Sequence, residues 1–202
     1  MKLYCTPGSP YARMARIVVL EKGLEGRVEV IMAKTRTADS PYYTINPSGR
    51  VPYLVRDDGV GMEESALICG YLDRLDGRPA LEPQGLEARR LEALARSYLD
   101  GLSVWLRELY RPPQERSPGI IRHEKDRAAR LADLWEREIA HPLMHGPLNM
   151  VQLTLSCALG IEMRMPDLDW RSGHPNLREW YERLAARPSF KATEPPPPAP
   201  VT

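Results

Sequence analysis

The sequence predicts a mixed α/β domain followed by an all-helical domain. Up to about residue 80, short strand-like stretches alternate with helix-like stretches, whereas beyond about residue 85 the apolar residues follow helical spacings alone. The two patterns meet at a linker, residues 76–83, that contains Pro79 and Pro83. Because 202 residues suffice for two small domains, we expect a sheet domain at 1–78, a helical domain at 85–190 and a proline-rich tail at 191–202.

The first domain is expected to run strand, helix, strand and then strand, strand, helix. A strand at 2–5 leads through a turn to a helix that begins at Pro10, a residue that suits a first helical position, and ends at Lys22-Gly23. The later elements are a strand at 28–33, an irregular stretch at 35–43, strands at 51–55 and 60–62 joined by a hairpin turn at 57–59, and a helix at 64–75. This order implies a small mixed sheet with helices packed on it.

The second domain is expected to be a helical bundle. Its helices are expected at about 86–110, 120–139, 150–163 and 175–187. Pro112-Pro113 ends the first of them. The third is apolar on most sides, which predicts a central position, and Asn149 and Gln152 predict a capping pair at its start.

Composition and charge exclude several classes of function. The net charge is +1, whereas a dedicated nucleic-acid-binding protein carries a clear basic excess. No apolar run approaches the roughly 18 residues that span a bilayer, and the N-terminus lacks the apolar core of a signal peptide. Cys5, Cys69 and Cys157 show neither a disulfide framework nor a zinc-ligand spacing. We therefore expect a reduced, cytoplasmic protein with no nucleic-acid, membrane or metal partner.

Three short stretches of the first domain carry groups that serve either to stabilise the fold or to bind a ligand. Ser9 precedes the first helix, where a hydroxyl either caps the helix or meets a bound group in the field of the helix end. Pro52 follows Val51 at the start of a strand, either as an edge device or as a cis peptide that turns the backbone of Val51 outward. Glu64 and Ser65 open a helix, whose free N–H groups are either self-capped or hold a carboxylate.

Taken in this order, these stretches resemble the cytosolic glutathione S-transferase family. The similar stretches of the first domain are residues 9–18, 21–24, 46–54 (Asn-Pro-Ser-Gly-Arg-Val-Pro-Tyr-Leu) and 64–73 (Glu-Ser-Ala-Leu-Ile-Cys-Gly-Tyr-Leu-Asp). In the second half, residues 107–112, 157–160 and 188–196 look like a bacterial branch of that family, here with a serine at the start of the first helix. The resemblance covers nearly the whole chain and implies a thioredoxin-like domain, a helical domain and a homodimer.

The resemblance also implies roles for particular residues. Ser9 matches the position that faces the sulfur of glutathione, the co-substrate of the family. Val51, before a cis Pro52, matches the backbone that pairs with the cysteinyl part, and Glu64 and Ser65 match the groups that bind the γ-glutamyl part. The residues implied for glutathione binding are therefore Arg50, Val51, Pro52, Glu64 and Ser65. At the start of the helix expected at 150–163, the family usually has a Ser/Thr-x-x-Asp cap, where this sequence has Asn149 and Gln152.

The implied chemistry is activation of the glutathione thiol for attack on a small electrophile bound between the two domains. Lowering a thiol pKa from about 8.5 to about 6.5 requires about 2.7 kcal/mol. A hydrogen bond to a charged group supplies roughly 1.5–3 kcal/mol, so Ser9 need only donate its O–H to the thiolate. The residues expected to line the second pocket are Tyr11, Trp105, Arg107, Tyr110 and Arg111. Trp105 and Tyr110 are equally consistent with ordinary core packing.

Two other functions fit the same resemblance. A glutathione-dependent thiol–disulfide oxidoreductase or peroxidase would place Cys at the helix start, where this sequence has Ser9, although Cys5 lies four residues earlier and its reactivity is left open. A binding protein that retained the fold without catalysis would not need Ser9. A metal site at His141 and His145 is disfavoured because Pro142 interrupts the helix that would align them.

Overall fold

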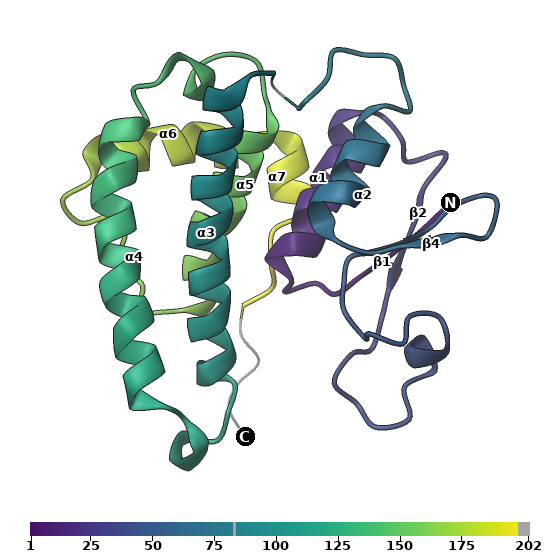
Figure 1. Cartoon of the computed structure of the whole chain (residues 1–202), viewed down its shortest axis with the longest axis horizontal. Helices are drawn as coiled ribbons and strands as arrows, with labels where there is room; N and C mark the ends of the chain where they lie inside the picture. Colours follow the sequence, from purple (N-terminus) through teal and green to yellow (C-terminus); the bar gives the residue numbers. More distant parts are fainter. Residues whose placement is uncertain (83, 198–202) are drawn as a thin grey trace. The chain divides into compact units, whose positions relative to one another are not determined.

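The structure confirms a mixed-sheet region followed by a helical region. The computed structural model describes residues 1–82 and 84–197. These fall into two compact units, one made of Met1–Glu82 with Pro188–Pro196 and the other mainly of Pro83–Arg187 (Figure 1). Each unit has its own buried apolar core.

The first unit is built on a four-stranded sheet with the order β2-β1-β3-β4. The strands are β1 (Lys2–Cys5), β2 (Glu29–Met32), β3 (Tyr53–Val55) and β4 (Gly61–Met62). β1 is parallel to β2 and antiparallel to β3, and β3 is antiparallel to β4. Leu3 and Leu54 face each other across β1 and β3, and both are fully buried, which fixes the register because a one-residue slip would expose them.

Two helices, α1 (Pro10–Glu21) and α2 (Ser65–Asp73), pack against each other in this unit. Each expected strand and helix of this unit is found, with ends that differ by at most two residues from the sequence expectation. The stretch expected to be irregular contains a short 3-10 helix, η1 (Pro41–Thr44), which begins at a proline after the capping residue Ser40. The side chain of Ser40 accepts a hydrogen bond from Tyr42 N.

A further short helix, α7 (Pro188–Ala192), returns to the first unit and was not expected from the sequence. The buried Arg13 of α1 donates to the carbonyl of Phe190 at 3.1 Å, and Ser189 donates to the carboxylate of Glu21. The structure thus groups residues 188–196 with the first unit, although the expected helical domain extends to residue 190. The expected tail at 191–202 lies partly outside the described residues.

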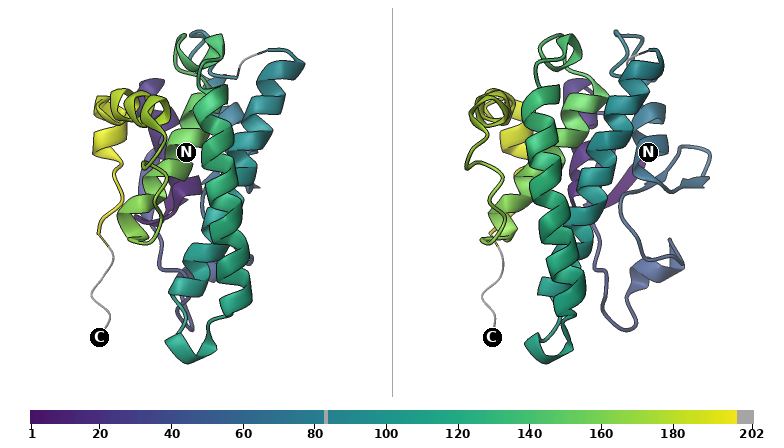
Figure 2. Two further views of the ribbon diagram at one scale, coloured as in Figure 1. Left: turned by 90° about the vertical axis from the view of Figure 1, so that its left-hand side faces the viewer. Right: turned by 60° about the vertical axis from the view of Figure 1, so that its left-hand side comes forward.

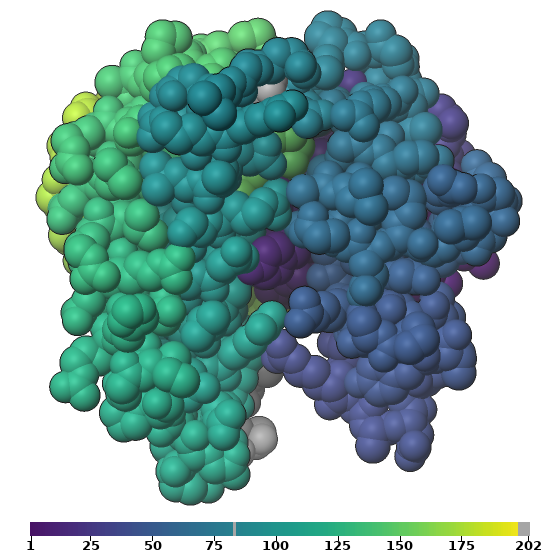
Figure 3. Space-filling model, viewed as in Figure 1, coloured from purple at the N-terminus to yellow at the C-terminus, as the bar shows by residue number. Residues whose placement is uncertain are grey.

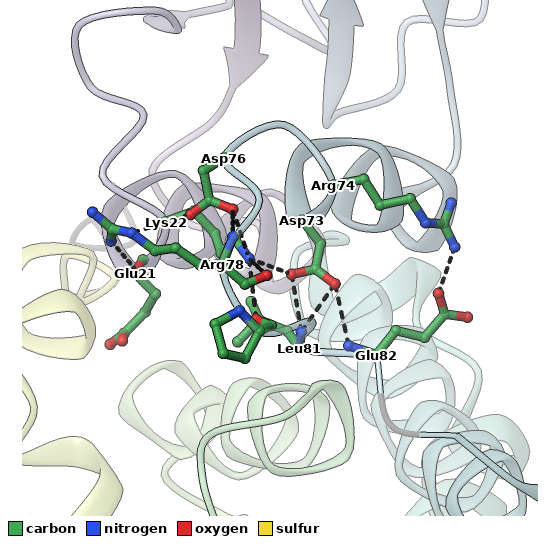
Figure 4. Close-up of polar contacts among 9 residues, drawn as sticks. Glu21, Lys22, Asp73, Arg74, Asp76, Arg78, Leu81 and Glu82 are labelled. Atoms are coloured by element: carbon green, nitrogen blue, oxygen red, sulfur yellow. Dashed lines mark hydrogen bonds and ion pairs between the residues drawn. The ribbon is translucent and has the colours of Figure 1, made fainter.

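The linker after α2 is held to the first unit by buried charges (Figure 4). Lys22, which caps the C-terminal end of α1, contacts Asp73 at 3.0 Å and Asp76 at 2.9 Å, and both Lys22 and Asp73 are 2% exposed. Asp73 also accepts hydrogen bonds from the backbone N–H groups of Leu81 and Glu82. Burial opposes the charge of Lys22, but the hydrogen bonds to Asp76 and Asp73 outweigh it and raise the pKa of Lys22.

The second unit contains the helices α3 (Leu86–Leu109), α4 (Pro118–Glu138), α5 (Met150–Leu159) and α6 (Pro175–Ala185). Short 3-10 helices lie between them at Pro113–Glu115, Pro142–Met144 and Gly160–Arg164, the last labelled η4. α3 packs against both α4 and α5 (Figure 2). In the space-filling view, α3 and α4 form the visible face of this unit (Figure 3).

The central helix α5 is buried along its whole length, as its apolar sequence predicts. The side chain of Asn149 caps it by accepting from the N–H groups of Val151 and Gln152. The side chain of Gln152 does not complete a reciprocal capping box but donates to the carbonyl of Leu143 at 2.7 Å. α5 is shorter than expected, because the chain continues from Gly160 as the 3-10 helix η4. Within the described residues, no helix is long and apolar enough to cross a membrane.

Candidate functional site

The three stretches singled out in the sequence lie at the same edge of the sheet. β1 and β3 are antiparallel with Tyr4 opposite Tyr53, and β3 and β4 are antiparallel with Leu54 opposite Met62. The C-terminal ends of β1 and β4 therefore lie beside the N-terminal end of β3. Ser9 follows β1, the segment Val51-Pro52 precedes β3, and Glu64 follows β4, so the register brings all three to the same edge.

Ser9 is the N-cap of α1. Its Oγ accepts a hydrogen bond from Ala12 N at 3.2 Å, and the backbone around Ser9 is extended. A serine hydroxyl has one proton to donate besides its acceptor positions. Among the described residues, no acceptor is recorded for that proton, so the cap leaves Ser9 able to donate toward the sheet edge.

The peptide bond between Val51 and Pro52 is cis, as expected. Pro52 is buried and Val51 is half-buried. Within the described residues, neither the N–H nor the C=O of Val51 forms a hydrogen bond. A donor and an acceptor on one residue, both unpaired, are the groups that an extended peptide ligand uses in strand-like pairing.

The loop before Val51 is held by a polar network that sequence reasoning missed. Buried Asn46 donates to the carbonyl of Arg50 at 3.0 Å and to Glu63 at 3.0 Å, and the hydroxyl of Tyr42 donates to the same carbonyl at 2.5 Å. Ser48 also donates to Glu63. The hydrogen bonds from Ser48 and Asn46, with the nearby charge of Arg50, lower the pKa of Glu63.

Arg50 itself is exposed, and its backbone rather than its guanidinium carries the contacts of this network. The turn residues Asn46 to Gly49 were a usable signal for a fixed loop. The partner Glu63 is 17 residues from Asn46, so local pattern could not have supplied it.

Glu64 and Ser65 form the start of α2. Glu64 has a φ of 74°, a left-handed conformation that non-glycine residues rarely adopt and that costs free energy. Its carboxylate caps the helix by accepting from Ala66 N at 2.9 Å and Leu67 N at 3.4 Å, and Ser65 Oγ lies 3.3 Å from it. Glu64 is exposed, whereas Ser65 is 3% exposed. The self-capping alternative therefore describes the helix as it stands, with a strained backbone at the exposed residue whose carboxylate caps the helix.

Cys5 lies at the same edge but is not an activated thiol. It is fully buried, and burial raises its pKa to about 12, which the nearby charge of Arg16 reduces only in part. A thiol with a raised pKa has little thiolate at neutral pH, so this arrangement does not favour Cys5 as a reactive thiol.

The other expected pocket residues are divided between the two units. Tyr11 is half-buried on α1. Trp105 is 2% exposed in the helical core, in keeping with the packing alternative, while Arg107, Tyr110 and Arg111 are exposed at the C-terminal end of α3. Among the described residues, no group of three or more His, Cys, Asp or Glu side chains forms a metal site.

Models of two protein families match this chain. The glutathione S-transferase N-terminal domain matches residues 8–75, which contain the whole sheet edge from Ser9 to Ser65. The glutathione S-transferase C-terminal domain matches residues 92–183 in the helical unit. The chain belongs to the glutathione S-transferase family, and more particularly it is similar to bacterial members.

One such relative is the uncharacterized GST-like protein YibF of Escherichia coli (strain K12), which is 31% identical over 97% of this chain and 99% of its own length. Among solved structures, a glutathione transferase family member from Pseudomonas fluorescens Pf-5 with bound glutathione has a TM-score of 0.87 and 31% identity, covering 96% of this chain and 98% of that chain. The same protein with bound S-(propanoic acid)-glutathione has a TM-score of 0.85 and 32% identity, covering 97% of this chain and 100% of that chain.

Proposed function

We propose that this chain is a glutathione transferase that binds glutathione at the sheet edge of the first unit and activates its thiol for attack on a small electrophile. The observation that carries this proposal is the register, which brings the Ser9 hydroxyl, the unpaired backbone of Val51 and the start of α2 to one edge. The similar Pseudomonas structures with bound glutathione and a glutathione thioether support it.

Each part of glutathione has a chemically suited partner at this edge. The backbone of Val51 offers one N–H and one C=O to the cysteinyl part, beside the cis Pro52. The hydroxyl and N–H of Ser65, at the positive end of α2, suit the γ-glutamyl carboxylate. The negative charge of the Glu64 carboxylate, which caps the helix, suits the ammonium group. Arg50, exposed beside Val51, suits a second carboxylate of the ligand.

Ser9 acts in this proposal as a donor rather than as a base. Its O–H donates to the thiolate sulfur while its oxygen keeps the cap on Ala12 N, and the end of α1 adds roughly 0.3–1 kcal/mol. The sulfur lone pair then forms a bond to the electrophilic carbon. In a substitution the leaving group departs with the electrons of its bond to that carbon. In an addition to an activated double bond, the π electrons move to the neighbouring carbon, which takes up a proton.

The residues proposed to contact the electrophile are Tyr11, Arg107, Tyr110 and Arg111, whose side chains are at least partly exposed. Trp105 is left out of this set because it is enclosed in the helical core. A homodimer is also proposed, because the resemblance to the family implies one and because α3 carries more apolar positions than one packing face requires, with Leu86 84% exposed. Sedimentation at micromolar concentration that gives the mass of one 22.9 kDa chain would contradict the dimer.

The test of the function is Ser9→Ala with Ser117→Ala as its matched control. Ser117 caps α4 in the same way, with its Oγ accepting from Ile120 N at 3.3 Å, so both variants lose one helix cap. We expect Ser9→Ala to leave glutathione affinity nearly unchanged but to raise the pKa of the bound thiol by about one to two units. Turnover of a model electrophile at pH 7 then falls about tenfold to fiftyfold and recovers as the pH rises.

Ultraviolet titration of the glutathione thiolate bound to each protein measures the pKa directly. If the Ser9→Ala and wild-type curves superimpose, Ser9 serves as a helix cap alone. Tight glutathione binding without turnover by the wild type would favour the non-catalytic binding protein.

A further inference from the structure

The C-terminal end of α3 and the helix η4 form a cationic and aromatic surface within the helical unit. The guanidinium of Arg164, at the end of η4, lies 5.4 Å from the centre of the Tyr110 ring. Stacking on an aromatic ring holds the planar guanidinium in a fixed orientation. Tyr110 remains 46% exposed, so the pair borders solvent.

Arg164 has no anionic partner within the residues that the structure describes. Its Nε is buried and makes no hydrogen bond, and no ion pair is formed by its guanidinium. A buried N–H without an acceptor costs free energy, which an incoming oxygen ligand would recover. By contrast, Arg171 nearby on the same stretch of chain is held bidentately by Glu162 at 2.7 and 2.8 Å.

A second arginine lies on the same surface without a partner. Arg107 is three residues before Tyr110, and side chains at that spacing share one face of a helix. Arg107 is exposed and makes no side-chain hydrogen bond or ion pair among the described residues. The next two arginines along the chain already have hydrogen-bond partners. Arg111 donates to the carbonyl of Glu115, and Arg116 donates to the carbonyls of Arg111 and Leu109.

Exposed apolar residues lie close to these two cations along the chain. Val104, one turn before Arg107, is 39% exposed, and Met163, next to Arg164, is 47% exposed. The nearby carboxylate of Glu108 is turned to other partners, because it accepts from Ser117 N at 2.7 Å. The surface therefore offers two unpaired guanidinium groups beside apolar and aromatic side chains.

We propose that Arg164 and Arg107 bind the carboxylate of the electrophilic substrate, so that the enzyme selects small carboxylic acids with an apolar or aromatic body. This inference rests on the proposed transferase function and names the class of its second substrate. The guanidinium fork matches the two oxygens of a carboxylate, and the ring of Tyr110 with Val104 and Met163 suits the remainder of such a molecule.

A matched pair of electrophiles tests the selection. One is para-chloro-meta-nitrobenzoate, and the other is its amide, in which a neutral carboxamide replaces the carboxylate. In both, the glutathione sulfur forms a bond to the ring carbon that carries chlorine, and chloride leaves with the electron pair of the carbon–chlorine bond. The two reactions differ in the group offered to the arginines.

The variants are Arg164→Gln, Arg164→Lys and the control Arg130→Gln. Arg130 is an exposed residue of α4, and its replacement by Gln changes the net charge by the same amount. We expect Arg164→Gln to raise KM for the benzoate about tenfold while KM for the amide, and kcat for both, stay within about twofold. Arg164→Lys restores part of the benzoate affinity because it keeps the charge without the fork, and Arg130→Gln changes neither KM.

Binding without turnover separates this inference from the proposed function. Calorimetric titration of the full chain with the benzoate and with the amide, in the absence of glutathione, is expected to show tighter binding of the benzoate that Arg164→Gln abolishes. Equal binding of the two compounds, or an equal effect of Arg164→Gln and Arg130→Gln, overturns the carboxylate site even if transferase activity is present. Selective benzoate binding without turnover of either compound supports the carboxylate site and overturns the proposed function.

Discussion

Polar groups differ in burial and pairing between the C-terminal and the N-terminal ends of the helices α1 and α2. At their C-terminal ends, Lys22 and Asp73 are buried and each has several partners, including backbone groups of the linker (Figure 4). At their N-terminal ends, Ser9 and Glu64 cap the helices with their side chains, and the backbone of Val51 beside them forms no hydrogen bond within the described residues.

The difference separates an end with buried, paired charges from an end whose polar groups are half-buried or exposed, within one small unit. Buried charges are tolerated where every one of them is paired, because an unpaired buried charge is strongly destabilising. Groups that face solvent can stay partly unpaired at little cost, and a ligand can then use them. The strained backbone of Glu64 lies at the open end, where strain is expected at functional sites.

Replacing Lys22 by Met should give the largest effect. It leaves the buried Asp73 without its cation and leaves Asp76 with the exposed Arg78 at 3.4 Å, and we expect the free energy of unfolding to fall by about 3–5 kcal/mol. Arg74→Met is the matched control, since Arg74 pairs with Glu82 at 2.7 Å with both side chains exposed, and it should cost about 0–1 kcal/mol. Urea unfolding followed by circular dichroism measures both, and equal losses would show that burial does not distinguish these pairs.

Replacing Ser65 by Ala should act on ligand binding more than on stability. It removes one donor to the ligand carboxylate, worth about 1.5–3 kcal/mol, so glutathione affinity should fall roughly tenfold to a hundredfold. Ser103→Ala is the control, because Ser103 is a similarly buried serine of α3 whose hydroxyl has no hydrogen-bond partner among residues 1–82 and 84–197. Calorimetry that finds equal affinity for wild type and Ser65→Ala would remove Ser65 from the site.

The pH dependence of the free energy of unfolding should reflect the ionisation of Lys22 and Asp76, the pair that holds the linker. The hydrogen bonds from Lys22 and from the N–H of Arg78 outweigh burial and lower the pKa of Asp76, so its contribution is present above the ordinary value of 3.8 and is lost as the pH falls through the folded-state pKa. The pKa of Lys22 is raised, so its contribution is present below 10.5 and is lost as the pH rises through the folded-state pKa. We expect the urea midpoint of unfolding to be constant between these two pH values and to fall at lower and at higher pH. In Lys22→Met, both the acidic and the basic fall should be smaller. Unchanged falls in that variant would assign them to other groups.

Cys5 should give the smallest effect, namely no reaction. With a pKa of about 12, roughly one Cys5 thiol in a hundred thousand is ionised at pH 7. Iodoacetamide should therefore leave Cys5 unmodified in the folded chain while free glutathione in the same mixture reacts, as peptide mass spectrometry would show. Alkylation of Cys5 as fast as glutathione would return the oxidoreductase alternative to consideration.

Much of the local structure was predictable because its causes are local. The strand at 2–5, the helix starting at Pro10 and the cap at Asn149 follow from residue type and spacing within a few positions. The helix α7 was missed because it has five residues and is stabilised by Arg13, which lies 177 residues earlier than its partner Phe190. The contacts of Lys22 with Asp73 and Asp76 were missed for the same reason, since nothing near Lys22 identifies its partners.

The sequence by itself determined the order of elements, the caps and the residues able to meet a ligand, because propensity, capping and turn chemistry act over a few residues. Tertiary structure decided which of those residues share an edge, because the antiparallel register of β1, β3 and β4 is set by burial of residues such as Leu3 and Leu54 across the sheet. It also decided that Trp105 belongs to the core and that Cys5 is buried, which raises the pKa of its thiol, since burial depends on what the rest of the chain places around a side chain.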